Sequence, residues 1–269
     1  MKKKLAILCI LCCALPSISR AQGTDNDLET GFGARVSVSA DKKIVKGLHV
    51  VADAEVRSTD NFNDLGRYQT GLGVTYKISD FLKVGAGYLF IEKKNSSDVW
   101  NPRNRFYGDA TLSYKTGPWK FSLKERLQLT CREVNNPYQD TPNLLALKSR
   151  VKAAYKATAS LTPYAYVEAR NVFNDPSCSA VWSTSSQKYS DYVFDGYKHA
   201  YFNRFRGSLG LEWEFGMHHA LDFYLLADYC HDKNVDVNKD GTKLKSLTWD
   251  RTFLTSFGIG YTFSFVSIR

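Results

Sequence analysis

The chain has 269 residues, of which 43% are hydrophobic, 14% aromatic and 23% charged. This composition excludes an intrinsically disordered chain, a collagen-like chain and a bundle of membrane-spanning helices. The formal net charge is +9. Residues 1–21 carry four Lys and Arg and no acid, so the remaining residues have a net charge of 32 − 27 = +5. That mild charge does not indicate nucleic acid as a partner.

Residues 1–21 have the features of a secretory signal peptide. Three lysines follow the first Met and precede an apolar run from Leu5 to Leu15. Small residues occupy the positions three before and one before a predicted cleavage ahead of Gln22. The apolar run is shorter than the ~20 residues that a membrane helix needs. The sequence therefore predicts removal of residues 1–21 during export and one mature domain over 22–269.

From Phe32 onward, apolar and polar residues alternate with a period of two. In 48–57, for example, Leu48, Val50 and Val56 lie on one face of a strand, whereas Asp53 and Glu55 lie on the other. One residue, Glu125, interrupts an apolar face. The pattern predicts eleven strand segments, which are 32–40, 48–57, 67–78, 82–90, 105–115, 119–132, 145–156, 161–170, 204–215, 221–229 and 256–265.

The segments are typical of a closed antiparallel transmembrane β-barrel. Many have 10–14 residues, whereas strands of soluble proteins usually have about 5–6. Aromatic residues gather near the ends of the apolar faces, as in the girdles of membrane barrels. Tight connections also alternate with long polar ones, which predicts short periplasmic turns and long outer loops. The long connections are 58–65, 92–103, 133–143, 173–199 and 231–248.

The number of strands poses a difficulty. Single-chain bacterial barrels usually have an even number of strands, so we expect about twelve. The first and last segments, 32–40 and 256–265, would both run toward the periplasmic side if 41–47 is a short turn. Either a strand is hidden within 173–199 or near the N-terminus, or 41–47 is not a periplasmic turn.

Several segments resemble the domain of unknown function 2490 family, a group of outer-membrane β-barrels from Gram-negative bacteria. The resemblance rests on 54–61, 71–78 and 82–88, together with 119–126, 147–150 and the Pro163-Tyr164 pair with Glu168. It implies a fold and a place, but no activity, cofactor or functional residue. The last segment also resembles the C-terminal signal read by the barrel assembly machinery, although four residues follow its final aromatic.

The polar faces carry many charged residues that we expect to line the lumen. Bases outnumber acids among them, which favours an anion-attracting passage. The alternative is an ion-pair network that fills a narrow barrel. The candidate lumen residues are Arg35, Asp53, Glu55, Arg57, Arg67, Arg105, Asp109, Arg126, Arg150, Glu168, Arg170, Arg204, Arg206 and Glu212.

Three functions remain open at this stage. The first is a narrow pore or passive transporter in the outer membrane, and the second is a non-conducting barrel that meets a partner through its outer loops. The third is a barrel enzyme, with inner carboxylates as candidates, although no catalytic set is evident. We expect no metal, no cofactor and no nucleic acid to bind. The expected partners are outer-membrane lipid and, during insertion, the barrel assembly machinery. The oligomeric state and any pairing among Cys131, Cys178 and Cys230 stay open.

Overall fold

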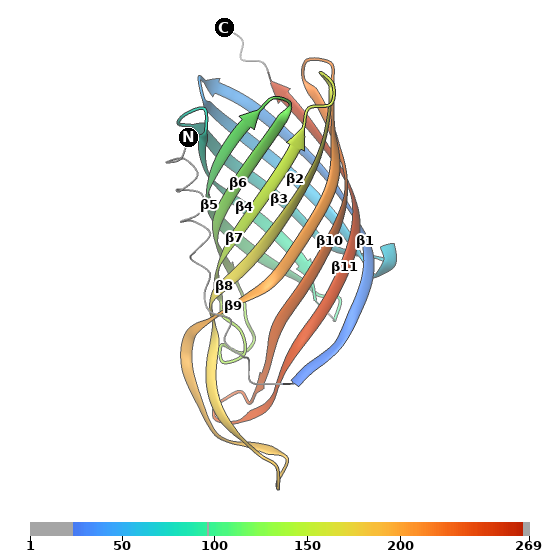
Figure 1. Ribbon diagram of the computed structural model, residues 1–269. Coiled ribbons are helices and arrows are strands. Elements are labelled where there is room, and N and C mark those ends of the chain that lie inside the picture. The colour runs from blue at the N-terminus through green and yellow to red at the C-terminus, as the bar shows by residue number, and fades with distance from the viewer. Residues whose placement is uncertain (1–23, 96, 266–269) are drawn as a thin grey trace.

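The computed structural model describes residues 24–95 and 97–265, and strands dominate this part of the chain (Figure 1). The signal peptide predicted at 1–21 lies outside the described residues. None of the described residues forms a helix long and apolar enough to span a bilayer. The strands are β1 (Thr24–Val45), β2 (Leu48–Thr59), β3 (Asp64–Lys77), β4 (Leu82–Lys94), β5 (Trp100–Thr116), β6 (Trp119–Arg132), β7 (Asn143–Tyr155), β8 (Leu161–Ser183), β9 (Lys188–Phe215), β10 (His219–Val237) and β11 (Leu244–Phe265), and a short 3₁₀ turn, η1 (Asp60–Phe62), follows β2.

The sheet closes on itself through an unusual seam. Each strand pairs antiparallel with its sequence neighbours, whereas β1 and β11 pair in parallel from Thr24 with Thr248 to Lys42 with Phe265. The expected all-β closed barrel is therefore confirmed, but twelve strands and a wholly antiparallel sheet were wrong. Both terminal strands run toward the short-turn end, and their parallel pairing satisfies both free edges without a twelfth strand.

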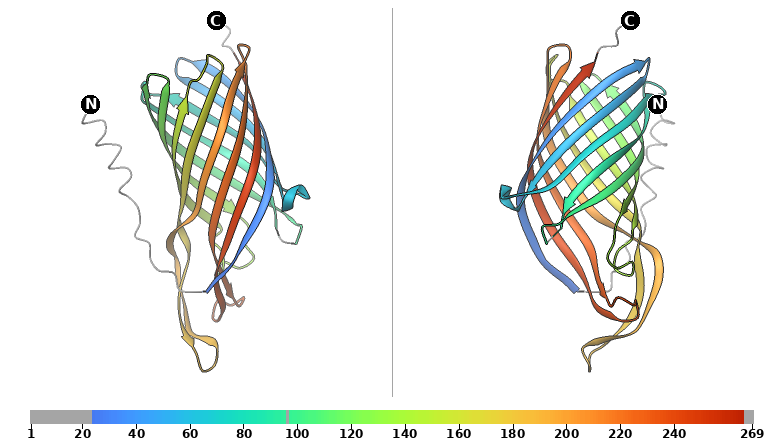
Figure 2. Two further views of the ribbon diagram at one scale, coloured as in Figure 1. Left: turned by 45° about the vertical axis from the view of Figure 1, so that its right-hand side comes forward. Right: turned by 180° about the vertical axis from the view of Figure 1, so that it is seen from behind.

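Apolar side chains cover the outer surface of the barrel wall. In a soluble protein such side chains would be buried, but here Leu209 is 66% exposed and Val167 is 63% exposed. The alternation predicted from sequence places them on the outward face of the strands. Figure 2 shows that these strands are tilted relative to the long axis of the barrel. Further exposed members are Val36, Val38, Val56, Leu72, Val74, Leu127, Val151 and Leu225. An outer surface of this kind is suited to contact with lipid chains.

Aromatic rings form clusters near both ends of this apolar band. At the short-turn end, Trp119 lies against Phe121 and Tyr155. At the opposite end, Tyr68 lies against Trp100, with ring centroids 5.2 Å apart. Amphipathic rings at the two water boundaries are characteristic of membrane barrels.

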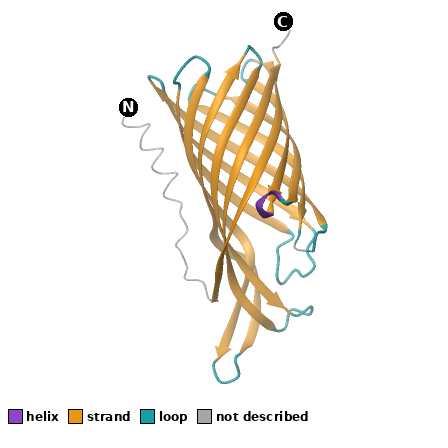
Figure 3. Ribbon diagram, turned by 90° about the vertical axis from the view of Figure 1, so that its right-hand side faces the viewer, coloured by secondary structure: helices purple, strands orange, loops and turns teal. Residues whose placement is uncertain are grey.

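Three of the connections expected to be loops are largely strands. β4 and β5 continue through much of 92–103, β8 and β9 through most of 173–199, and β10 and β11 through most of 231–248. β8 loses its pairing with β7 after Val172, and β9 loses its pairing with β10 before Arg204, so beyond these points the two strands pair with each other (Figure 3). Apolar and polar residues do not alternate cleanly in these segments, which lie beyond the closed part of the sheet.

Inward-facing glycines make room for tyrosine rings inside the barrel. A Cβ atom at Gly73 would lie 2.6 Å from the Oη atom of Tyr107, which crosses from β5 over β4 toward β3. Likewise, Gly258 of β11 lies beneath the ring of Tyr224 from β10. The alternating glycines of the strand segments are therefore explained by close packing of the inner wall.

Candidate functional site

A cavity of about 730 Å³ lies inside the barrel and reaches Asp140 and Asp175 at its long-loop end. Fifteen Arg and Lys side chains and six Asp and Glu side chains line it, together with neutral polar groups and a few apolar ones. In a confined low-dielectric space this surplus of positive charge attracts anions. The described residues contain no group of three or more His, Cys, Asp and Glu that could hold a metal ion.

The structure places the fourteen sequence-predicted residues on the inner side of the wall, at different depths. Ten of them contact the cavity, and Glu168 lines a smaller adjoining cavity of about 90 Å³. Asp53, Asp109 and Glu212 lie outside the cavity lining, and the side chain of Asp109 is only 4% exposed behind its cationic partners. The ten are Arg35, Glu55, Arg57, Arg67, Arg105, Arg126, Arg150, Arg170, Arg204 and Arg206.

One buried carboxylate, Asp228 of β10, holds three arginines. Arg206 Nη2 donates to Asp228 Oδ2 at 2.7 Å, while Arg204 and Arg35 form ion pairs with it at 3.4 and 3.5 Å. The Asp228 side chain is 3% exposed. Three cations from β9 and β1 around a single acid leave a local positive excess even in this paired group.

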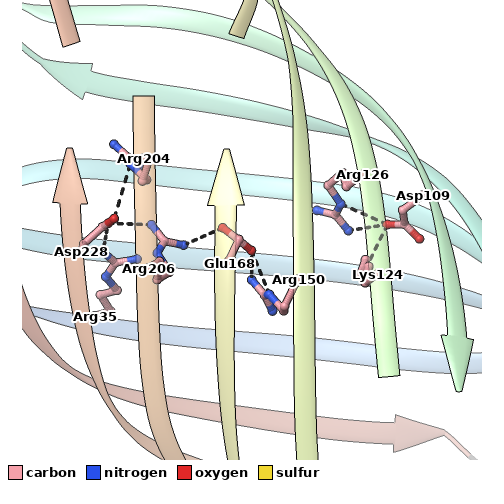
Figure 4. A network of polar contacts seen from close by, with 9 residues as sticks. All are labelled: Arg35, Asp109, Lys124, Arg126, Arg150, Glu168, Arg204, Arg206 and Asp228. Atoms are coloured by element: carbon pink, nitrogen blue, oxygen red, sulfur yellow. Dashed lines mark hydrogen bonds and ion pairs between the residues drawn. The ribbon is translucent and has the colours of Figure 1, made fainter. Parts of the chain in front are cut away.

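A second carboxylate, Glu168 of β8, continues the chain of ion pairs around the wall (Figure 4). Arg150 of β7 donates to Glu168 Oε2 from Nε at 2.8 Å and from Nη2 at 2.6 Å. Arg206 reaches the other carboxylate oxygen at 3.5 Å and so links this group to Asp228. The arrangement fixes the side chains of four neighbouring strands in one network.

A third group forms around Asp109 of β5. Arg126 of β6 donates twice to Asp109 Oδ2, and Lys124 lies 3.1 Å from the same oxygen. The Arg126 guanidinium also stacks on Tyr107, 3.9 Å from the ring centroid. These contacts hold both cations against the wall and direct the remaining guanidinium surface toward the cavity.

The ion pairs follow the wall and do not cross the lumen. Among the described residues, each ion pair inside the barrel joins groups on one strand, on adjacent strands, or on strands separated by one other. Lys152 of β7 reaches Glu212 of β9, for example, across β8 at 2.5 Å. The predicted ion-pair network therefore exists as a belt along the wall, and a cavity remains beside it.

Four arginines in the same lumen lie outside this belt of ion pairs. Arg67, Arg103, Arg105 and Arg170 form no ion pair with any described residue, and all four contact the cavity. Arg105 Nε donates to Thr130 Oγ1 at 2.8 Å, a neutral acceptor. We call these four residues the unpaired arginine cluster.

Three relevant lumen residues were missing from the sequence-based set. Lys93 and Arg103 fall in 92–103, which was expected to be a loop, although the alternation that includes Arg105 continues through it. Asp228 shares the polar face of 221–229 with Asp222, so the alternation of the strand was sufficient to predict that Asp228 faces the lumen. The alternation does not predict that Asp228 is the central acid of the network.

Beyond the barrel wall, the extended hairpins and the loop between β6 and β7 pack into one outer assembly. Val235, Val237, Leu244 and Leu247 form a small apolar core there. Gln139 of the loop donates to the backbone oxygen of Val237 at 3.0 Å. This contact shows that the β6–β7 loop is anchored to the β10–β11 hairpin.

Two titratable groups face each other in the β8–β9 part of the outer assembly, where Asp175 pairs with His199 across the ladder. Burial raises the pKa of Asp175 to about 7, while Lys233 and Arg132 act in the opposite direction and Asp140 and Asp232 add to it. Burial lowers the pKa of His199 to about 4, and the nearby charge of Lys233 adds to this effect. Both groups are therefore held in their neutral forms near pH 6.

The family model for a protein of unknown function, DUF2490, matches residues 32–239. The chain belongs to the DUF2490 family. The DUF2490 match includes β2 to β10 in full, and with them every residue of the three ion-pair groups. No curated protein matches the chain.

Among solved structures, an in-vitro folded outer membrane protein of Vibrio cholerae, OmpT, is similar at 15% identity with a TM-score of 0.31. The match covers 74% of this chain and 58% of the OmpT chain, so this chain spans less than two thirds of it.

Proposed function

We propose that this DUF2490 protein is exported, inserts into the bacterial outer membrane and conducts small anions through its lumen. The observation that carries the proposal is the cavity of about 730 Å³ with fifteen cationic and six acidic side chains in its lining. The apolar outer band and the two groups of aromatic rings support the membrane location. The course of the ion pairs along the wall supports an open passage.

The lumen chemistry favours anions over cations. Rings of Arg and Lys select anions in pores, because each cationic group lowers the free energy of an anion that has left bulk water. Eleven strands lie between the eight at which side chains fill a barrel and the sixteen at which wide channels appear. We therefore expect a narrow, anion-preferring conductance.

The test is single-channel recording of the refolded mature chain in a planar bilayer, with reversal potentials measured in a KCl gradient. We expect discrete steps with a chloride preference that decreases in the Arg103→Gln/Arg105→Gln variant. These two arginines form no ion pair with a described residue, so their removal leaves no acid unpaired. The control is Lys188→Gln/Lys198→Gln, two exposed cations on the outer hairpin, which should keep the selectivity unchanged. A properly inserted but silent barrel would refute conduction and favour a non-conducting barrel acting through its outer assembly.

We further propose that the barrel is not an enzyme. Of the four inner carboxylates that sequence made candidates for catalysis, three are engaged by cations, with Glu55 bound to Arg57, Asp109 to Arg126 and Glu168 to Arg150. A structural role accounts for these three, whereas the fourth, Asp53, forms no ion pair with a described residue. Hydrolysis of outer-membrane phospholipid by the refolded chain, abolished by Glu168→Gln, would contradict this proposal.

A further inference from the structure

The unpaired arginine cluster lies toward the long-loop end of the lumen. Arg67, Arg103 and Arg105 stand within six residues of the long-loop ends of β3 and β5. Arg170 stands two residues before the point at which β8 loses its pairing with β7. Since β3 and β8 lie on opposite sides of the closed sheet, the cluster extends over the half of the wall that runs from β3 through β5 to β8.

The four guanidinium groups act on one another electrostatically. Arg105 experiences the positive charges of Arg170 and Arg103, and Arg67 experiences that of Arg105. Like charges brought together in a confined space destabilise the fold, so the cluster carries a free-energy cost that the wall itself does not offset.

The acids whose charges act on the cluster form no ion pair with it. Glu55, which acts on Arg67, is bound by Arg57. Asp232, which acts on Arg170, accepts a hydrogen bond from Asn203 Nδ2 at 2.7 Å. The cluster thus differs from the paired groups around Asp228 and Glu168, where a carboxylate lies at the centre.

Several donors of the cluster are also unused. The buried Nε atoms of Arg67, Arg103 and Arg170 have no hydrogen-bond partner among the residues that the structure describes. Unsatisfied buried donors are rare, and each costs about 1–3 kcal/mol unless another group accepts its hydrogen bond. Guanidinium groups present their donors in a planar fork that matches the oxygens of phosphate and carboxylate groups.

We propose that the unpaired arginine cluster is a binding site for a polyvalent oxyanion, with phosphoryl or carboxyl oxygens that accept from several guanidinium groups at once. A monovalent anion leaves most of the clustered charge uncompensated, whereas an anion with two or more charges compensates more of it. The cavity is also within the size range of small-molecule sites, about 300–1,000 Å³. The inference rests on the proposed function in that it assigns a binding step to the same passage.

The test is calorimetric titration of the refolded chain in detergent with pyrophosphate and, separately, with citrate, at a constant KCl concentration. We expect binding of at least one probe, and in Arg67→Gln/Arg170→Gln an affinity at least ~100-fold lower, because two charge-assisted contacts are lost. Preference for pyrophosphate or for citrate tells phosphoryl from carboxyl recognition. The control is Lys83→Gln/Lys120→Gln, which removes two cations at the short-turn end.

Stability against urea provides a second measurement. We expect pyrophosphate or citrate to raise the urea midpoint of the wild-type chain and to leave that of the double variant unchanged. Without a probe, the variant should be at least as stable as wild type, because like-charge repulsion is relieved. Absence of binding by both probes, or equal loss in the short-turn control, would overturn the site.

The two proposals fail separately. Binding without conductance would retain the oxyanion site and refute the pore. Anion-selective conductance with no binding of either probe would retain the pore and refute the site.

Discussion

Replacement of Asp228 by Asn should strongly destabilise the barrel. Asn is nearly isosteric but removes the charge around which Arg206, Arg204 and Arg35 converge at 2.7, 3.4 and 3.5 Å. Loss of one partner from a buried ion pair costs about 3–5 kcal/mol, because it leaves uncompensated charge behind. Arg204 is 23% exposed and Asp228 borders the cavity, so water offsets part of this cost. We expect a loss of about 3 kcal/mol.

Equilibrium unfolding by urea in lipid vesicles, followed by tryptophan fluorescence, measures this change. The matched control on the same strand is Asp236→Asn, whose side chain is 46% exposed and pairs with one lysine, and which should change stability by less than about 1 kcal/mol. A double variant Asp228→Asn/Arg35→Gln should recover part of the loss, since Asp228 is the ion-pair partner of Arg35. Stability of Asp228→Asn within about 0.5 kcal/mol of wild type would refute the reasoning.

Two further predictions concern the outer surface and the outer assembly. Leu209→Arg should lower stability by about 2–4 kcal/mol because Leu209 faces lipid. The control is Val193→Arg, at an exposed apolar residue beyond the wall, which should change stability by less than about 1 kcal/mol. Equal effects of the two substitutions on unfolding in vesicles would refute the face assignment. Asp175 has a folded-state pKa raised to about 7, so its stabilising contribution is present below pH 3.8 and is lost as the pH rises through 7. His199 has a folded-state pKa lowered to about 4, so its contribution is present above pH 6.5 and is lost as the pH falls through 4. Between pH 4 and 7, the stability of the hairpin measured by hydrogen exchange should therefore rise with pH in Asp175→Asn and fall with pH in His199→Gln. Each slope should be at most ~1.4 kcal/mol per pH unit. Parallel profiles of the two variants would contradict both assignments.

The family and the class of fold could be predicted from the sequence because both depend on local pattern. Alternation along a strand decides which side chains face lipid and which face the lumen, and a shift of one residue would reverse both faces. Lipid on one side makes the pattern clear, so 48–57 and 204–215 lie within strands as predicted. The same reasoning failed for 173–199, where no lipid imposes an alternation.

The number of strands depended on contacts between the two ends of the chain. The sequence shows that the first and last segments run in the same direction, but not that β1 and β11 pair. Phe32 and Thr255 lie opposite each other in this parallel pair although they are more than two hundred positions apart, so local periodicity contains no information about the pairing. The need to pair every backbone group inside a membrane selects this closure.

The sequence by itself determined a chain of amphipathic strands with a basic inner face, because side-chain direction follows from position along a strand. Only the tertiary structure decided which of those charges are neutralised. Arg206 and Arg170 both lie on the polar face of their strands. Among the described residues, Arg206 forms ion pairs with two carboxylates, whereas Arg170 forms none. The difference arises from strand register and barrel curvature, which set the distance between side chains on separate strands, and Coulomb energies depend on that distance.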